Sequence, residues 1–200
     1  TTPKRADFSK IRTISIAGRA SKVRPGDFAF PIDPKRDSFR EFVRKLPKFL
    51  AANDLRAIVD DIVAARRRKA PVILMMEAHV IKVGLAPILI DLIRRRVITA
   101  VAMNSAAAIH DVETALWGKT SEDVATNMLD GSFGMARETG EFINGALVSA
   151  YWESDEGYGE ALGRRLIAAK ARFRAHSLLA TCIRQNITVT VHAAIGTDII

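Results

Sequence analysis

One stretch of this chain, residues 71–111, constrains the fold more than any other. Residues 72–76 and 98–103 are two unbroken apolar runs. Between them, apolar side chains recur at helical spacing from Leu85 to Ile93, and three arginines follow where cations suit the helix dipole. Two apolar strands joined by one amphipathic helix predict a βαβ crossover. They therefore predict a parallel sheet whose first strand is covered on both faces.

Polar loops are expected at the ends of these strands. Ligands of open parallel sheets bind beyond the carboxyl ends of the strands, which here means residues 77–84 and 104–111. Alternating β-branched residues predict another strand at 187–191, followed by a loop at 192–198. Three of the four histidines fall in these loops. The candidate polar residues are Glu77, His79, Lys82, Asn104, Ser105, His110, Asp111, His192, Thr197 and Asp198.

The candidates also have structural explanations. His79 fits a satisfied histidine at a strand end, and His192 fits a core position. Asn104 fits a residue that ties down the backbone, and Asp111 fits a helix cap as well as it fits catalysis. His110 and His192 remain the candidate catalytic groups.

Asp198 is the best single candidate for ligand contact, because a carboxylate after a parallel strand suits a ribose hydroxyl. The chain has no G-x-G-x-x-G and no G-x-x-x-x-G-K-[ST], so neither a standard dinucleotide fingerprint nor a P-loop is supported. A zinc site built from His79, His110 and His192 is an alternative that nothing in their spacing favours, and no metal is predicted.

The remaining sequence predicts an arm and then a single domain. Residues 1–37 are turn-rich, with one candidate strand at 11–17, and residues 38–200 carry the domain. The chain ends on an apolar pair after a loop, which indicates a truncated C-terminal end. Helices are expected at 39–46, from a cap at Asn53 to the arginines at 66–68, at 106–117, from about Glu122 to about Asp130, at 138–151 and at 160–184.

Composition narrows the classes of partner. No apolar run reaches the roughly 18 residues of a membrane span, and the N-terminus has no apolar signal region. With one cysteine, these features predict a cytoplasmic protein that does not enter a membrane. The net charge is +8, but the basic residues mostly close helices and aromatics are only 6%, so nucleic-acid binding is not expected.

Several segments together resemble the deoxyhypusine synthase family, in particular its bacterial and archaeal deoxyhypusine-synthase-like branch. The resemblance covers most of the chain from about Asp37. It implies a Rossmann-like three-layer α/β fold, with a mostly parallel sheet flanked by helices, that binds NAD in a homo-oligomer, commonly a tetramer. The segments that carry it are AHVIKVGLAPILIDLIRRRVITAVAMNSAAAIHD, GKTSEDVATNMLDG, FGMARETGEFIN, GYGEALG and VTVHAAIGTDII.

The resemblance also assigns roles to residues. The family's first dinucleotide loop falls on 77–84, with His79 where synthases usually carry asparagine, and its second falls on 104–111. The implied cofactor-binding residues are Ala78, His79, Asn104, Ser105, Ala106 and Asp198. Ala106 and Ala107 replace family glycines, and Ile109 and His110 replace the paired glutamates that hold the ammonium groups of the polyamine. No residue of this chain matches the family's imine-forming lysine.

The resemblance implies a transferase. It would use NAD to move an aminoalkyl group from a polyamine-type donor to an amine acceptor, such as a protein lysine, through an imine. The alternative is a non-catalytic NAD-binding scaffold or sensor of the same family, which the replaced carboxylates favour.

Overall fold

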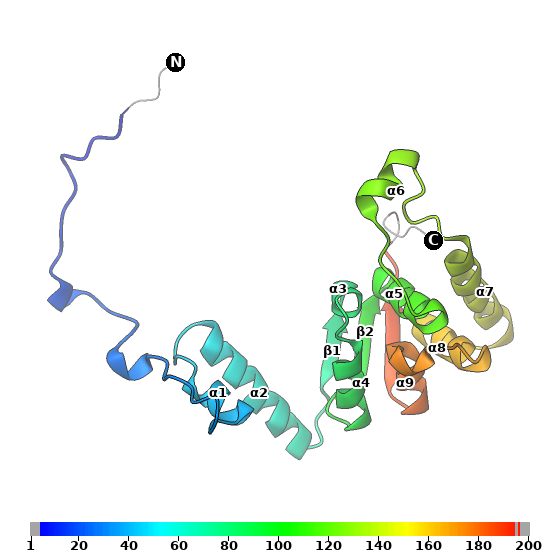
Figure 1. Ribbon diagram of the computed structural model, residues 1–200, viewed down its shortest axis with the longest axis horizontal. Helices are drawn as coiled ribbons and strands as arrows, with labels where there is room; N and C mark the ends of the chain where they lie inside the picture. The colour runs from blue at the N-terminus through cyan, green and yellow to red at the C-terminus, as the bar shows by residue number, and fades with distance from the viewer. Residues whose placement is uncertain (1–4, 195, 197–200) are drawn as a thin grey trace. The chain divides into compact units, whose positions relative to one another are not determined.

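The computed structural model describes residues 5–194 and residue 196, so Asp198 and Thr197 lie outside the described residues. The chain divides into two compact units, Thr1–Asp61 and Ile62–Ile200 (Figure 1). The expected arm of residues 1–37 ends inside the first unit. No helix in the described ranges is both long enough and apolar enough to cross a membrane.

The first unit contains short helices and no strand among its described residues. Its elements are the 3-10 helices η1 (Ile16–Gly18) and η2 (Pro25–Asp27), followed by α1 (Phe39–Lys45) and the start of α2 (Ala51–Arg67). The strand expected at 11–17 was wrong. Ser15 caps η1 there by accepting a hydrogen bond from the Ala17 amide, and the segment pairs with no strand.

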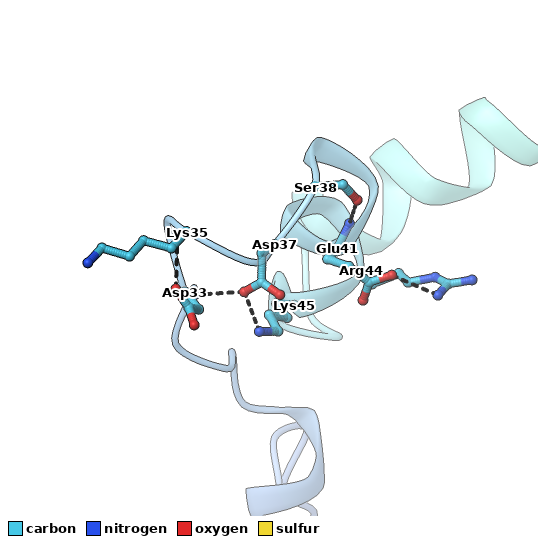
Figure 2. A network of polar contacts seen from close by, with 7 residues as sticks. All are labelled: Asp33, Lys35, Asp37, Ser38, Glu41, Arg44 and Lys45. Carbon is cyan, nitrogen blue, oxygen red and sulfur yellow. Dashed lines mark hydrogen bonds and ion pairs between the residues drawn. The ribbon is translucent and has the colours of Figure 1, made fainter.

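Polar contacts hold the start of α1 (Figure 2). Ser38 caps the helix by accepting a hydrogen bond from the Glu41 amide. Asp37 accepts hydrogen bonds from the Lys45 ammonium and the Asp33 amide. The bond from Lys45 is the main reason that the pKa of Asp37 lies below its usual value. The helix predicted at 39–46 is therefore confirmed, together with its cap.

The start of α2 differs from the expectation. Asn53 was predicted to cap this helix, but α2 begins at Ala51 and Asn53 lies inside it. The Asn53 and Asp54 amides both donate to the Leu50 carbonyl, so the backbone begins the helix before the asparagine is reached. The Asn53 side chain instead accepts a hydrogen bond from Arg56.

The second unit is built on a three-stranded parallel sheet. The strands are β1 (Ile73–Met76), β2 (Ala100–Asn104) and β3 (Thr188–His192), in the order β1-β2-β3. Val101 pairs with Leu74 on one side and with Val189 on the other, which fixes the register. Helices pack against the sheet, so the α/β class and the parallel sheet are confirmed.

Apart from the end of α2, the described helices of this unit lie in the two crossovers. Between β1 and β2 lie α3 (His79–Lys82) and α4 (Ala86–Arg94). Between β2 and β3 lie α5 (Ser105–Trp117), α6 (Val124–Asp130), α7 (Arg137–Glu153), α8 (Tyr158–Ala168), η3 (Arg174–His176) and α9 (Leu178–Arg184).

The sheet is covered on one face. Val101 and Val189 belong to the apolar core with residues of α4, α5, α8 and α9, and the partly buried Leu74 packs against it. The alternate positions face outward, and Ile73 and Met75 remain 59% and 79% exposed. The expectation that the first strand is covered on both faces was therefore wrong. Both crossovers step in the same direction along the sheet, and right-handed connections then place their helices on the same side.

The long helix expected at 160–184 is broken in the structure. It becomes α8, η3 and α9. Lys170 has a φ of 51°, and the Ala171 amide turns back to the Leu166 carbonyl, which ends α8. Ser177 then starts α9 by accepting a hydrogen bond from the Ala180 amide. The break lets α8 and α9 pack against each other at Gly163 instead of forming one rod.

Candidate functional site

The strand β2 runs directly into α5, so the helix expected at 106–117 is confirmed. It begins at Ser105 and replaces the loop expected at 104–111. Asn104 caps this helix, because its side-chain oxygen accepts a hydrogen bond from the Ala107 amide at 2.9 Å. Gly118, at a φ of 70°, ends the helix as expected. The explanation of Asn104 as a residue that ties down the backbone is confirmed.

A cavity of about 690 Å³ lies along one side of α5. Helix α5 contributes Ala106, Ile109, His110, Glu113 and Trp117, which follow the spacing of a single helix face. The other walls come from α3 and from the segments that lead into α6 and α7. The residues are Lys82, Lys119, Thr120, Ser121, Glu122, Val124, Phe133, Gly134, Ala136, Glu138 and Thr139. Figure 1 shows α3 and the start of α5 beside the carboxyl ends of β1 and β2. The cavity therefore opens at the end of the sheet where ligands were predicted.

A chain of hydrogen bonds runs along the cavity wall. The Thr120 hydroxyl donates to Glu113 Oε2 at 2.5 Å, and His110 Nδ1 lies 2.6 Å from the same hydroxyl oxygen. The Thr139 hydroxyl donates to Glu113 Oε1 at 3.1 Å. Thr120 and Thr139 lie on different segments, so Glu113 ties α5 to both.

The environment of His110 disfavours a charged ring. Burial is the main cause that lowers its pKa from the usual 6.5, and the positive charges of Lys82 and His79 lower it further. The carboxylates of Glu113 and Glu77 act in the opposite direction. The neutral form of the His110 ring is therefore favoured.

The cavity contains more acidic than basic side chains. Glu113, Glu122 and Glu138 line it, against Lys82 and Lys119. Glu122 is held in place, because its two oxygens accept hydrogen bonds from the Gly134 amide and the Asn127 side chain. Although the whole chain is basic, the cavity can attract a cation.

The structure brings some of the predicted site residues together and separates others. Lys82, Ala106 and His110 line the cavity. His79 is exposed and its Nδ1 lies 2.9 Å from the Glu77 carboxylate, an interaction that lowers the pKa of Glu77.

Among the described residues, the other predicted cofactor-binding and catalytic residues do not line the cavity. Ala78 and Ser105 are buried. His192 is exposed and contacts the Thr190 hydroxyl at 2.9 Å, so its explanation as a core residue was wrong. Residues 77–84, expected as a loop, contain the short helix α3.

Asp111 has a structural role that its sequence position did not indicate. Although it lies next to His110, it is fully buried and does not cap its own helix. Its carboxylate accepts hydrogen bonds from the Ser177 hydroxyl and from the Leu178 and Leu179 amides, at the start of α9. Burial raises its pKa to about 6, against the effect of these three hydrogen bonds.

Glu113, Thr120 and Thr139 were not among the predicted site residues. Glu113 could have been found, because it lies one helical turn after His110 and so on the same face of α5. Thr120 and Thr139 could not, because they reach the site from other segments. Within residues 5–194 and 196, no three histidine, cysteine, aspartate or glutamate side chains are grouped to hold a metal ion.

Comparison with solved structures finds similar chains, whereas comparison of the sequence finds none. No family and no curated protein matches the sequence. The apo structure of ArgZ, an arginine dihydrolase from the ornithine-ammonia cycle in cyanobacteria, aligns with 75% of this chain at 21% identity and a TM-score of 0.49. This chain spans 20% of that protein. A similarity of this size carries no information on function.

Proposed function

We propose that this protein is a deoxyhypusine-synthase-like, NAD-dependent transferase with a Rossmann-like fold. It moves an aminoalkyl group from a polyamine-type donor to an amine acceptor through an imine. The observation that carries the proposal is the cavity beside α5, which places carboxylates and a neutral histidine together at the carboxyl end of a parallel sheet. The sequence resemblance described above supplies the cofactor and the type of reaction.

The cavity suits both NAD and an amine. Its volume of about 690 Å³ lies within the range of about 300–1,000 Å³ usual for small-molecule sites. Ala106, in the first turn of α5, is a small residue on the wall, and a helix N-terminus suits a pyrophosphate. Ala107, the other alanine at a family glycine position, is buried in the core and does not line the cavity, so its methyl group does not narrow the site.

The carboxylates that line the cavity hold the ammonium groups of the donor in place of the paired glutamates that this chain lacks. The resemblance places those glutamates at Ile109 and His110, but Glu113, Glu122 and Glu138 line the same cavity from other positions. Carboxylates attract ammonium groups, and this attraction is stronger in a partly enclosed site than in water. A polyamine-type donor is therefore the substrate class that this charge pattern favours.

The reaction balances without an outside oxidant. The carbon next to the amine nitrogen gives up a hydride, which NAD accepts when bound, and the nitrogen gives up a proton, so that an imine forms. The acceptor amine attacks the imine carbon and the first amine leaves. The hydride and one proton then return to the new imine. The protein holds the two amines, accepts and returns the proton, and excludes water.

Calorimetric titration of the full chain with NAD tests the cofactor. We expect binding, and we expect Ala106→Phe, which fills the cavity, to weaken it at least tenfold. Ala169→Leu changes an exposed alanine outside the cavity and should leave the affinity unchanged. The proposed site would be contradicted if NAD did not bind, or if Ala106→Phe and Ala169→Leu bound NAD with equal affinity.

NADH absorbance with a panel of polyamines then tests the reaction. NADH formed in the presence of a polyamine supports the transferase. NAD binding without NADH formation from any polyamine would replace it with the alternative, a non-catalytic NAD-binding scaffold or sensor.

A further inference from the structure

We propose that His110 is the general base of the cavity beside α5, held in its Nδ1–H tautomer by Thr120 and Glu113 so that Nε2 takes the proton from the bound ligand. This inference deepens the proposed function, because that function identifies the ligand as an amine. The hydrogen bonds of His110, Thr120 and Glu113 do not depend on that function.

The assignment of the tautomer follows from counting protons. A carboxylate only accepts hydrogen bonds, and a threonine hydroxyl has a single proton to donate. Glu113 uses one oxygen for Thr120 and the other for Thr139. Because the Thr120 proton points to Glu113, the Thr120 oxygen can only accept from His110, 2.6 Å away. Nδ1 therefore carries the ring proton.

The tautomer leaves Nε2 with its lone pair. No described residue forms a hydrogen bond with His110 Nε2, and the ring lines the cavity. A nitrogen with a free lone pair in a ligand-sized cavity can accept a proton. The charge that forms on the ring is then stabilised by Glu113 through Thr120, as in sites where a carboxylate orients a catalytic histidine.

Charged groups from several elements surround the ring. Glu113 lies on α5, Lys82 and His79 lie on α3, and Glu77 precedes α3. Together with burial, the two basic residues keep the ring neutral and ready to accept a proton at pH 7. The Glu113 carboxylate acts in the opposite direction and raises the pKa of His110, so the ring remains able to accept a proton.

The proton leaves the ligand nitrogen and binds to Nε2 during oxidation of the amine. It returns from Nε2 when the new imine is reduced, so the ring is neutral again after one turnover. Thr120 and Glu113 do not touch the ligand in this step. They are positioning residues that act through His110.

The tautomer can be measured without any substrate. In protein labelled with ¹⁵N-histidine, two-bond ¹⁵N–¹H correlation distinguishes Nδ1–H from Nε2–H rings, and His110→Gln identifies the signals of His110. We expect the Nδ1–H pattern at pH 7 and an apparent pKa below 6.5. Thr120→Ser keeps the hydroxyl and should preserve the tautomer. Thr120→Val removes it and should shift His110 toward the Nε2–H form.

The other three histidines serve as internal controls, because their signals should not change in the Thr120 variants if the fold is intact. Diethyl pyrocarbonate tests whether Nε2 faces the cavity, since it acylates an accessible unprotonated ring nitrogen. We expect His110 to be modified at Nε2, with a rate that rises with pH to a midpoint below 6.5.

Three results would overturn the proposal: an Nε2–H ring in the unchanged protein, the same tautomer in Thr120→Val, or a His110 that diethyl pyrocarbonate does not reach. If the polyamine panel forms NADH, His110→Gln should lower kcat by about 10²–10⁴-fold with little change in NAD affinity. A panel without NADH formation contradicts the proposed function and leaves the tautomer and acylation results to decide on His110.

Discussion

The hydrogen bonds of Asp111 predict a large loss of stability when its carboxylate is removed. In Asp111→Ala, the Ser177 hydroxyl and the Leu178 and Leu179 amides lose their acceptor, at distances that are now 2.6, 2.7 and 3.2 Å. All three donors belong to the start of α9, and Asp111 is fully buried, so no water replaces the carboxylate without rearrangement. The variant therefore weakens the attachment of α9 to α5.

The magnitude follows from the cost of unpaired buried groups. Each unsatisfied donor costs about 1–3 kcal/mol, and the change from aspartate to alanine also leaves a small cavity. Removal of the carboxylate relieves the cost of burying a charge, which offsets part of the loss. The net decrease in the free energy of unfolding is about 2–4 kcal/mol. Asp111→Asn keeps the shape and one acceptor oxygen, so it should cost about 1–2 kcal/mol.

Urea unfolding followed by tryptophan fluorescence measures this loss. Both tryptophans, Trp117 and Trp152, lie in the unit Ile62–Ile200, so the signal reports the unit that contains Asp111. With a urea dependence of about 1–3 kcal/mol per molar, the midpoint for Asp111→Ala should fall by about 1–2 M. Glu141→Ala, at an exposed position of α7, is the matched control and should change the free energy of unfolding by less than about 0.5 kcal/mol.

Two results would contradict this prediction: a cost below about 1 kcal/mol for Asp111→Ala, or a cost for Asp111→Asn equal to that of Asp111→Ala. The first result would mean that water or a backbone shift satisfies the three donors. The second would mean that the negative charge, and not the geometry of the acceptors, holds α9 in place.

Three further predictions concern the same core. Burial raises the folded pKa of Asp111 from 3.8 to about 6, so the protonated carboxyl stabilises the folded protein below pH 3.8. This stabilisation, about 3 kcal/mol, is lost as the pH rises to about 6. Asp111→Asn should flatten this part of a curve of unfolding free energy against pH. In the same urea assay, Gly163→Ala should lower the free energy of unfolding by about 1–3 kcal/mol, because the added methyl would lie 2.8 Å from the Leu179 carbonyl oxygen. In Gly145→Ala the added methyl would lie 3.4 Å from the nearest side chain, so this variant should stabilise its helix by about 0.5–1 kcal/mol. Burial, with a smaller effect of Asp111, raises the pKa of Cys182 to about 12. A disulfide reagent should therefore modify Cys182 only when the unit unfolds, and more rapidly in Asp111→Ala. Rapid reaction in the folded protein would contradict this.

The sheet and its first crossover were predictable because their signals are local. The strands β1, β2 and β3 come from short apolar or β-branched runs, and α4 comes from a helical repeat, so each could be found from neighbouring residues alone. The end of α5 at Gly118 and the cap of α1 at Ser38 are also local. The false strand at 11–17 shows the limit of this reasoning, because β-branched residues form a strand only when another strand is there to pair with them.

Helix breaks were harder to predict because no strong breaker marks them. The segment from α8 to α9 is rich in alanine, leucine and arginine, which favour a continuous helix. Tertiary packing instead breaks this segment into α8, η3 and α9. Gly163 lets α8 approach α9 closely, and Asp111 supplies the carboxylate that satisfies the start of α9. A tertiary contact has overridden a local preference, and its source lies 67 residues away in the sequence.

The two neighbouring residues His110 and Asp111 show why the site itself was only half predictable. The sequence places both just after a strand, and either one could be assigned to catalysis. In a helix, adjacent side chains point about 100° apart, so His110 lines the cavity while Asp111 enters the core. Periodicity could have separated them, since His110 shares its face with Ala106 and Glu113, and Asp111 shares its face with the buried Ala107 and Ala108. Periodicity could not supply the partner of each residue. Thr120, the partner of His110, comes from the segment before α6, and Ser177, the partner of Asp111, comes from the start of α9, so only the folded chain brings these hydroxyls to them.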